Sequence, residues 1–173
     1  PEQADAAIAG YTVVNDISIR DFQYHTTQFM PGKAWERQTP VGPHLVVANP
    51  GDEAHFPIEC IVDGQVMQSS NTKELCFGPI ALIQYISTFI TLVPGDLIYS
   101  GTPANSRRGV PGDVVEVEVE GLGKLTNHIV TGPTAIRTDV GAQPTESEEV
   151  VSTALGGDWE FRGIRTPSKD LYP

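Results

Sequence analysis

The chain has 173 residues, with 22 acidic against 11 basic side chains and a formal net charge of −11. A chain of this length buries roughly 70% of the surface that it exposes when unfolded, so folding requires neither a metal nor a disulfide. The acidic balance argues against a nucleic-acid or anionic-membrane binder, and 17 Gly with 14 Pro disfavour a helical bundle, which leaves cations and small molecules as partners.

The first predicted element is a strand over 11–14, and a dense polar block follows it directly at Asn15 to Gln23. The block alone is compatible with a short capped helix. In that interpretation Asp16 caps the helix, and Arg20 pairs with Asp16 or Asp21.

Asp63-Gly64 predicts a β-hairpin turn between strands over 58–62 and 65–68, because Asp-Gly suits a type I′ turn. Helical spacing of apolar residues then predicts one helix from Pro79 to Val93. Three Pro-Gly-Asp turns, at 50–52, 94–96 and 111–113, separate the extended segments.

Strands are predicted over 97–99 and 114–119, the second because Val alternates with Glu along it. Glu116, Glu118 and Glu120 share one face, which is either a solvated strand face or an oxygen-rich cation site. Gly121 to Leu125 lacks the spacing and the hydroxyl of a phosphate loop, and a hairpin turn is the alternative. The fold class is mainly β with short helices.

The two cysteines, Cys60 and Cys76, have no metal-binding or dithiol spacing, so we expect reduced thiols in a cytoplasmic protein. The uncharged stretch 76–95 is too short and too polar to cross a bilayer, and no membrane partner is expected. Residues 132–173 are predicted to be an irregular C-terminal segment of the same domain as 1–131.

Four motifs occur in one order along the chain. They are Asn-Asp-x-Ser-x-Arg-Asp-x-Gln at 15–23, Gly32-Lys33, Pro-x-Gly-Pro at 40–43, and Gly-Asp-Leu-Ile-x-x-Gly-Thr-Pro at 95–103. In this order they resemble the fumarylacetoacetate hydrolase family. The resemblance covers most of residues 10 to 130 and implies a mixed β-sandwich roll, a homodimer and a small dicarbonyl acid substrate.

The resemblance also implies a site that uses a divalent cation, Mg²⁺ with Mn²⁺ or Ca²⁺ as alternatives. Asp16 matches an aspartate metal ligand, and Lys33 matches the family's catalytic lysine, which also contacts substrate. Gln23 and Thr102 match substrate-binding residues. Arg20 and Asp21 match as well, and we expect them to form an ion pair that orients Asp16.

One part of the family pattern has no counterpart in residues 1–15. The family's other metal ligands form a Glu-x-Glu pair upstream of the matched aspartate, and its water-activating His/Glu dyad comes largely from the same region. We therefore expect the N-terminal part of the domain to be missing from this sequence. Two hypotheses follow: a metal-dependent hydrolase that cleaves a carbon–carbon bond of an acylpyruvate, with decarboxylase or isomerase as same-family alternatives, or a non-catalytic binding or structural module.

Overall fold

The structure is a computed structural model that describes residues 1–52, 54–106, 108–137, 139–141, 145, 147, 148 and 150. The chain forms two compact units. The first, called the sheet unit here, consists of Pro1–Asn15, Val41–Arg108 and Asp113–His128. The second, called the loop unit, consists of Asp16–Pro40, Gly109–Gly112 and Ile129–Pro173.

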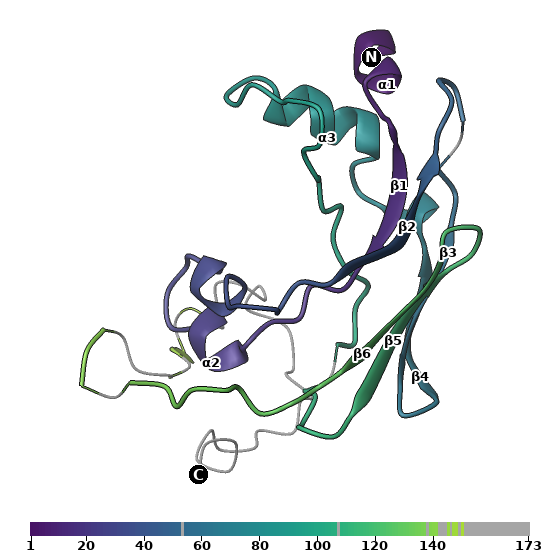
Figure 1. Ribbon diagram of the computed structural model, residues 1–173. Helices are drawn as coiled ribbons and strands as arrows, with labels where there is room; N and C mark the ends of the chain where they lie inside the picture. The colour runs from purple at the N-terminus through teal and green to yellow at the C-terminus, as the bar shows by residue number, and fades with distance from the viewer. Residues whose placement is uncertain are drawn as a thin grey trace. The chain divides into compact units, whose positions relative to one another are not determined.

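The sheet unit contains two antiparallel sheets (Figure 1). The smaller one pairs β1 with β2, and the larger one has the strand order β4-β3-β5-β6. Strand bounds are β1 Gly10–Val14, β2 Val41–Val47, β3 Pro57–Val62, β4 Gln65–Asn71, β5 Val114–Val119 and β6 Gly123–His128.

The predicted Asp-Gly hairpin is confirmed. Asp63 and Gly64 join β3 to β4 with φ angles of 50° and 78°, the left-handed values that a type I′ turn requires. Aspartate tolerates this region and glycine enters it without a steric penalty, which explains why the local sequence identifies the turn.

Strand β5 has the predicted alternation. Val115, Val117 and Val119 are buried, while Glu116 and Glu118 lie on the other face. Val117 and Val119 pack with Val13 of β1 and with Leu122 in the core of the sheet unit.

The opposite face of β5 is a charged strand surface. Lys124 of β6 lies 2.8 Å from Glu118 and 3.8 Å from Glu116, and Thr126 donates to Glu116 at 3.3 Å. Glu116 and Glu118 therefore pair with Lys124 on the exposed side of the sheet, which agrees with the solvated-face alternative. Gly121 to Leu125 forms the β5–β6 turn and the start of β6, as the hairpin alternative predicts.

Helix α3 is shorter than predicted, because it spans Pro79–Ile86 and does not continue to Val93. The hydroxyls of Ser87 and Thr88 donate to the carbonyls of Gln84 and Tyr85 at 3.0 and 2.7 Å, which closes the last turn. The other helices of this unit are α1 Glu2–Ala6 and the 3-10 turn η2 Thr72–Glu74.

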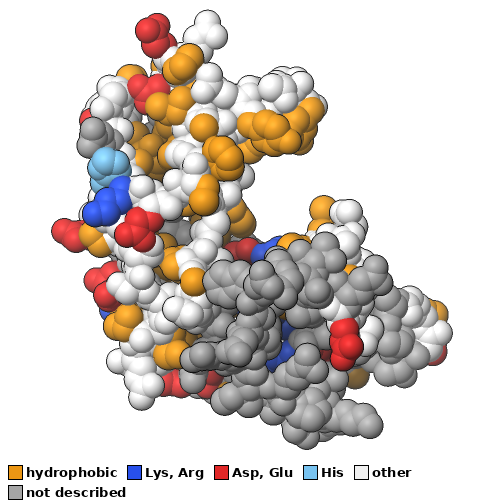
Figure 2. Space-filling view, turned by 180° about the vertical axis from the view of Figure 1, so that it is seen from behind, with side chains coloured by type: hydrophobic (Ala, Val, Ile, Leu, Met, Phe, Trp, Pro, Cys, Tyr) orange, Lys and Arg blue, Asp and Glu red, His pale blue; other side chains and the backbone are white. Residues whose placement is uncertain are grey.

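Large apolar side chains are exposed just before α3, at one position on it and along the segment after it, and Figure 2 shows hydrophobic side chains gathered on this part of the molecule. The exposed set is Phe77, Tyr85, Phe89, Ile90, Val93, Leu97 and Tyr99. The strand predicted over 97–99 is absent, because these residues pair with none of the described strands. A strand requires a partner for its backbone hydrogen bonds, and apolar sequence alone does not provide one.

The loop unit is built around α2 Arg20–Gln23 and the 3-10 turn η1 Met30–Gly32. Phe22 is buried and meets the ring of Trp35 edge-on, with 5.0 Å between centroids. Two described residues of the predicted C-terminal segment 132–173 contact α2: the backbone N–H groups of Thr145 and Ser147 donate to the carbonyls of Asp21 and Tyr24 at 3.1 and 2.9 Å. Residues 151–173 of that segment lie outside the described residues, and its assignment to the same domain as 1–131 stays a prediction.

The predicted fold class, mainly β with short helices, is confirmed. Within the described part of the chain, no helix is both long enough and apolar enough to span a membrane. Cys60 and Cys76 are free thiols.

Candidate functional site

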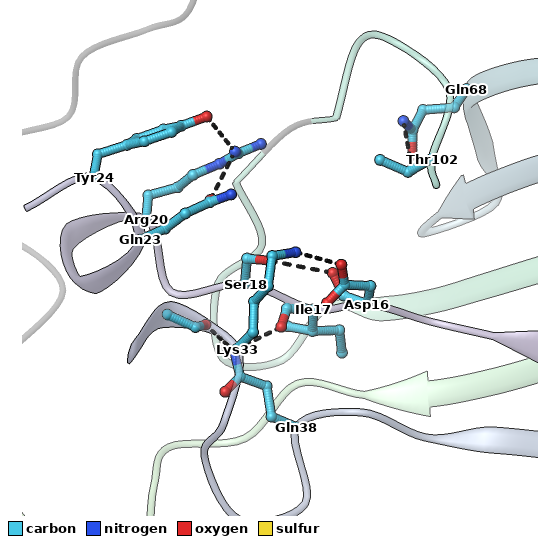
Figure 3. Close-up of polar contacts among 11 residues, drawn as sticks. Asp16, Ile17, Ser18, Arg20, Gln23, Tyr24, Lys33, Gln38, Gln68 and Thr102 are labelled. Carbon is cyan, nitrogen blue, oxygen red and sulfur yellow. Dashed lines mark hydrogen bonds and ion pairs between the residues drawn. The ribbon is translucent and has the colours of Figure 1, made fainter. Parts of the chain in front are cut away.

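Asp16 and Lys33 form the centre of the candidate site (Figure 3). The Lys33 ammonium donates to Oδ2 of Asp16 and, at 3.1 Å, to Oγ of Ser18. The Asp16 and Lys33 side chains are 34% and 32% exposed, so solvent and small solutes reach the pair. An ion pair with this exposure contributes up to about 1 kcal/mol to stability. Because this attraction is weak, the backbone on either side determines where the two side chains lie.

The capped-helix interpretation of this block is wrong in its details. Helix α2 begins at Arg20 after Ile19, and no side chain caps it. The Asp16 carboxylate instead binds Lys33, a residue that lies 17 positions further along the chain. Two of the residues predicted for the site are thus brought together by tertiary structure.

Helix α2 supplies the second group of predicted residues. The Arg20 guanidinium Nη1 donates to Oε1 of Gln23 at 3.0 Å and to the Tyr24 hydroxyl at 2.8 Å, and it also lies over the Tyr24 ring. Gln23 and Tyr24 are buried, and so is Asp21. One turn of helix brings positions 20, 23 and 24 to one face, which explains the arrangement. The predicted ion pair of Arg20 with Asp21 stays a prediction.

The two groups are joined through Gly32. The carbonyl of Gly32 accepts from the N–H of Ile19 at 2.9 Å, and a Cβ added to Gly32 would lie 2.7 Å from the backbone and Cβ of Gln23. Only glycine therefore allows the Lys33 turn to lie this close to α2.

Thr102 lies in the sheet unit, in the Gly-Thr-Pro loop after α3, and its side chain is exposed. The loop is held by Gln68 of β4, a buried side chain whose Nε2 reaches the carbonyls of Pro103 at 2.5 Å and Ala104 at 3.1 Å. The same nitrogen lies 3.5 Å from Oγ1 of Thr102.

Sequence reasoning gave no role to four residues that hold these side chains: Ser18, Tyr24, Gln38 and Gln68. Ser18 belongs to the first motif and Tyr24 lies one helical turn after Arg20, so pattern and spacing carried a usable signal for both. Buried glutamines outside a motif carry no comparable signal, because their role depends on which backbone carbonyls the fold places beside them.

A divalent cation would find only part of its ligand set among the described residues. The Asp16 carboxylate is the oxygen donor that Mg²⁺, Mn²⁺ or Ca²⁺ accepts, but such ions take six or more ligands. No group of three or more His, Cys, Asp or Glu side chains in this part of the chain is placed to hold a metal ion. Asp16 with its described neighbours is therefore not a complete metal site.

A family model described as the C-terminal region of fumarylacetoacetate hydrolase matches residues 1–130. The chain belongs to the fumarylacetoacetate hydrolase family. The structure also resembles solved members of this family.

Three relatives illustrate the family's range. The chain is 41% identical to a mitochondrial oxaloacetate tautomerase of Bos taurus over 73% of its own length and 44% of the relative's. It matches 5-carboxymethyl-2-hydroxymuconate delta-isomerase from Mycobacterium smegmatis with a TM-score of 0.72 and 37% identity, over 76% of this chain and 52% of that one. It matches fumarylpyruvate hydrolase from Pseudomonas aeruginosa, solved with Mn²⁺ and pyruvate, with a TM-score of 0.71 and 33% identity, over 76% and 58% of the two chains.

The chain spans about half the length of the relatives it matches. These fumarylacetoacetate hydrolase relatives include a tautomerase, an isomerase and a hydrolase, so family membership defines a group of enzymes and leaves the individual reaction open.

Proposed function

We propose that the protein is a divalent-metal-dependent hydrolase that cleaves a carbon–carbon bond in an acylpyruvate or related β-diketo acid. The observation that carries the proposal is the contact between Asp16 and Lys33, a carboxylate and an ammonium on the matching family motifs, in a solvent-accessible position. The Mn²⁺ and pyruvate of the fumarylpyruvate hydrolase relative support the choice of cofactor and substrate class.

In this proposal Asp16 is one of the metal ligands, and the described residues supply only this part of the ligand set. Bound Mg²⁺, or Mn²⁺ or Ca²⁺ in its place, supplies Lewis-acid polarisation of the two oxygens of a 1,3-dicarbonyl. Metal titration by calorimetry of the intact protein, compared with its Asp16→Asn variant, tests this assignment. Binding of equal affinity in both proteins would remove Asp16 from the site.

The proposed catalytic group is Lys33. Its ammonium is a hydrogen-bond donor fixed by Asp16 and Ser18, so it can stabilise negative charge that develops on a substrate oxygen without first reorienting. Its contacts with Asp16 and Ser18 hold the ammonium in one position beside the Asp16 carboxylate. This role requires Lys33 to keep its proton during the reaction.

Gln23 and Thr102 are the proposed substrate contacts. The Oε1 atom of Gln23 accepts from Arg20, which leaves its Nε2 as the atom that donates to substrate. Arg20 and Asp21 are proposed as supporting residues that keep this face of α2 in place. Thr102 offers a hydroxyl from a loop that Gln68 holds.

An isomerase, tautomerase or decarboxylase is the second candidate, and the isomerase and tautomerase among the relatives favour it. Hydrolysis of a diketo acid and keto–enol tautomerisation of such an acid both develop charge on an enolate oxygen, so the same Lys33 donor serves either reaction. A diketo acid assay with product analysis separates these reactions: two smaller acids indicate hydrolysis, one product of unchanged mass indicates isomerisation, and release of CO₂ with one shorter product indicates decarboxylation.

A non-catalytic module remains the rival from a different class, because the described residues hold an incomplete metal site. It predicts no metal binding and no turnover by the intact protein. A cytoplasmic location and a homodimer complete the proposal. Light scattering of the purified protein tests the dimer, and fractionation of the source cells tests the location.

A further inference from the structure

Gln38 is a buried polar residue in the loop that leads from the Lys33 turn toward β2. Its side chain is 8% exposed. The amide Nε2 donates to the carbonyls of Ile17 and Gly32, both at 2.6 Å, and its Oε1 accepts from the N–H of Trp35 at 3.1 Å. All three bonds lie inside the loop unit, so one side chain ties three points of its backbone together.

The two carbonyls that Gln38 binds are adjacent in sequence to the two members of the ion pair. Ile17 directly follows Asp16, and Gly32 directly precedes Lys33. One amide group therefore fixes the distance between the two backbone segments from which the carboxylate and the ammonium project (Figure 3). Because the ion pair is partly exposed and weak, its own attraction is not sufficient to hold those segments.

Gly32 extends this brace to α2. Its carbonyl accepts from Ile19 as well as from Gln38, and its Cα lies against Gln23 without room for a side chain. Displacement of the Gly32 peptide would therefore move Lys33 relative to both Asp16 and Gln23. Buried amides whose donors and acceptor are all engaged specify one arrangement, because any other arrangement leaves polar groups unpaired.

We propose that Gln38 is the positioning residue of the Asp16–Lys33 pair: its amide holds the Ile17 and Gly32 peptides at the spacing at which the ammonium contacts the carboxylate. The structural half of this inference stands on the hydrogen bonds alone. Its consequence for catalysis rests on the proposed function of the pair.

Two substitutions remove the donors and keep the approximate shape of the side chain. Gln38→Met removes donors and acceptor, whereas Gln38→Glu keeps the acceptor for Trp35 but turns a carboxylate toward two carbonyl oxygens. Gln28→Met is the matched control, since Gln28 is an exposed glutamine of the same unit. Thermal unfolding of each variant shows whether the fold is retained.

The direct readout is the NMR signal of the Lys33 ε-carbon in protein labelled at lysine, which is tractable because the sequence has four lysines. With Gln38 present, Asp16→Asn is expected to shift the Lys33 signal. In the Gln38→Met and Gln38→Glu backgrounds, Asp16→Asn is expected to shift the Lys33 signal far less. In the Gln28→Met background, Asp16→Asn is expected to shift that signal as much as it does in the wild-type protein. An equal shift in all backgrounds would overturn the proposal.

A second measurement covers variants that fail to fold. In the wild-type protein the Gln38 side-chain amide protons are expected to exchange slowly with solvent, as engaged and buried donors do; fast exchange would contradict the brace. Where the variants fold, kcat of the intact protein is expected to fall about 10- to 100-fold with KM changed far less. If the Gln38 variants lose the effect of Asp16→Asn on the Lys33 signal but keep the wild-type kcat, Gln38 positions the pair and the proposed catalytic function of the pair is rejected.

Discussion

Lys33 donates from one ammonium to Asp16 and Ser18, two residues of the motif that begins 18 positions before it. The pair is solvent-accessible, and the Gly32 peptide beside it packs against α2 with no space for a methyl group. A partly exposed pair held by a tightly packed backbone suits a site that must receive a ligand.

Gln68→Met is expected to loosen the Gly-Thr-Pro loop. The substitution leaves the carbonyls of Pro103 and Ala104 without their donor, at a cost of about 1–3 kcal/mol in the free energy of unfolding. KM for a diketo acid is expected to rise, because Thr102 loses its fixed position. Urea unfolding and steady-state kinetics measure the two effects. Gln65→Met, at an exposed position of the same strand, should change neither, and an effect as large there would refute the explanation.

Gly10→Ala is expected to destabilise the β1–β2 pair. A Cβ at this position would lie 2.2 Å from the carbonyl oxygen of Val46, so the two strands must move apart. Strain of this kind costs about 1–3 kcal/mol in the free energy of unfolding. Gly132→Ala is the control, since its nearest atom would be 3.9 Å away. Equal free energies of unfolding for the two variants in urea would show that β1 and β2 accommodate the added methyl group without strain, which would contradict the prediction.

Tyr11 is expected to make the protein sensitive to alkali. Burial raises the pKa of its phenol, and the nearby charges of Asp5 and Asp52 raise it further. The folded protein therefore keeps a proton that the unfolded chain releases above about pH 10, so this contribution to stability is complete below that pH and is lost as the pH rises through the folded pKa.

Urea unfolding between about pH 9 and pH 11 measures this loss. Tyr11→Phe should make the decline in stability less steep over that range. Tyr85→Phe, at a residue 70% exposed, should leave the slope unchanged. Identical slopes for wild type and Tyr11→Phe would assign the alkaline sensitivity to other groups.

Elements encoded by local sequence were predicted best. The Asp63-Gly64 turn and the alternation of β5 depend on a few adjacent residues, and both match the structure. Strand β2 was not predicted, because Gly42 and Pro43 interrupt its apolar pattern. The extension of α3 to Val93 was wrong because apolar periodicity continues past Ile86, where the hydroxyls of Ser87 and Thr88 end the helix.

In the candidate site, local sequence identified residues but did not predict the contacts between them. Asp16 and Lys33 were identified from motifs, but their mutual contact depends on how the chain returns after η1, which no local pattern encodes. Gln38 had no signal at all, since a single glutamine in a polar loop is indistinguishable from a surface residue until the carbonyls of Ile17 and Gly32 are placed beside it.

The central claim is that Asp16 and Lys33 act together on a metal-bound diketo acid. The most direct measurement is the loss of ultraviolet absorbance of an acylpyruvate on addition of the intact protein with Mg²⁺. Asp16→Asn and Lys33→Met are each expected to lower kcat/KM by about 100-fold or more, with Lys73→Met, at an exposed position, equal to wild type. Magnesium-dependent turnover that survives both substitutions would contradict the claim.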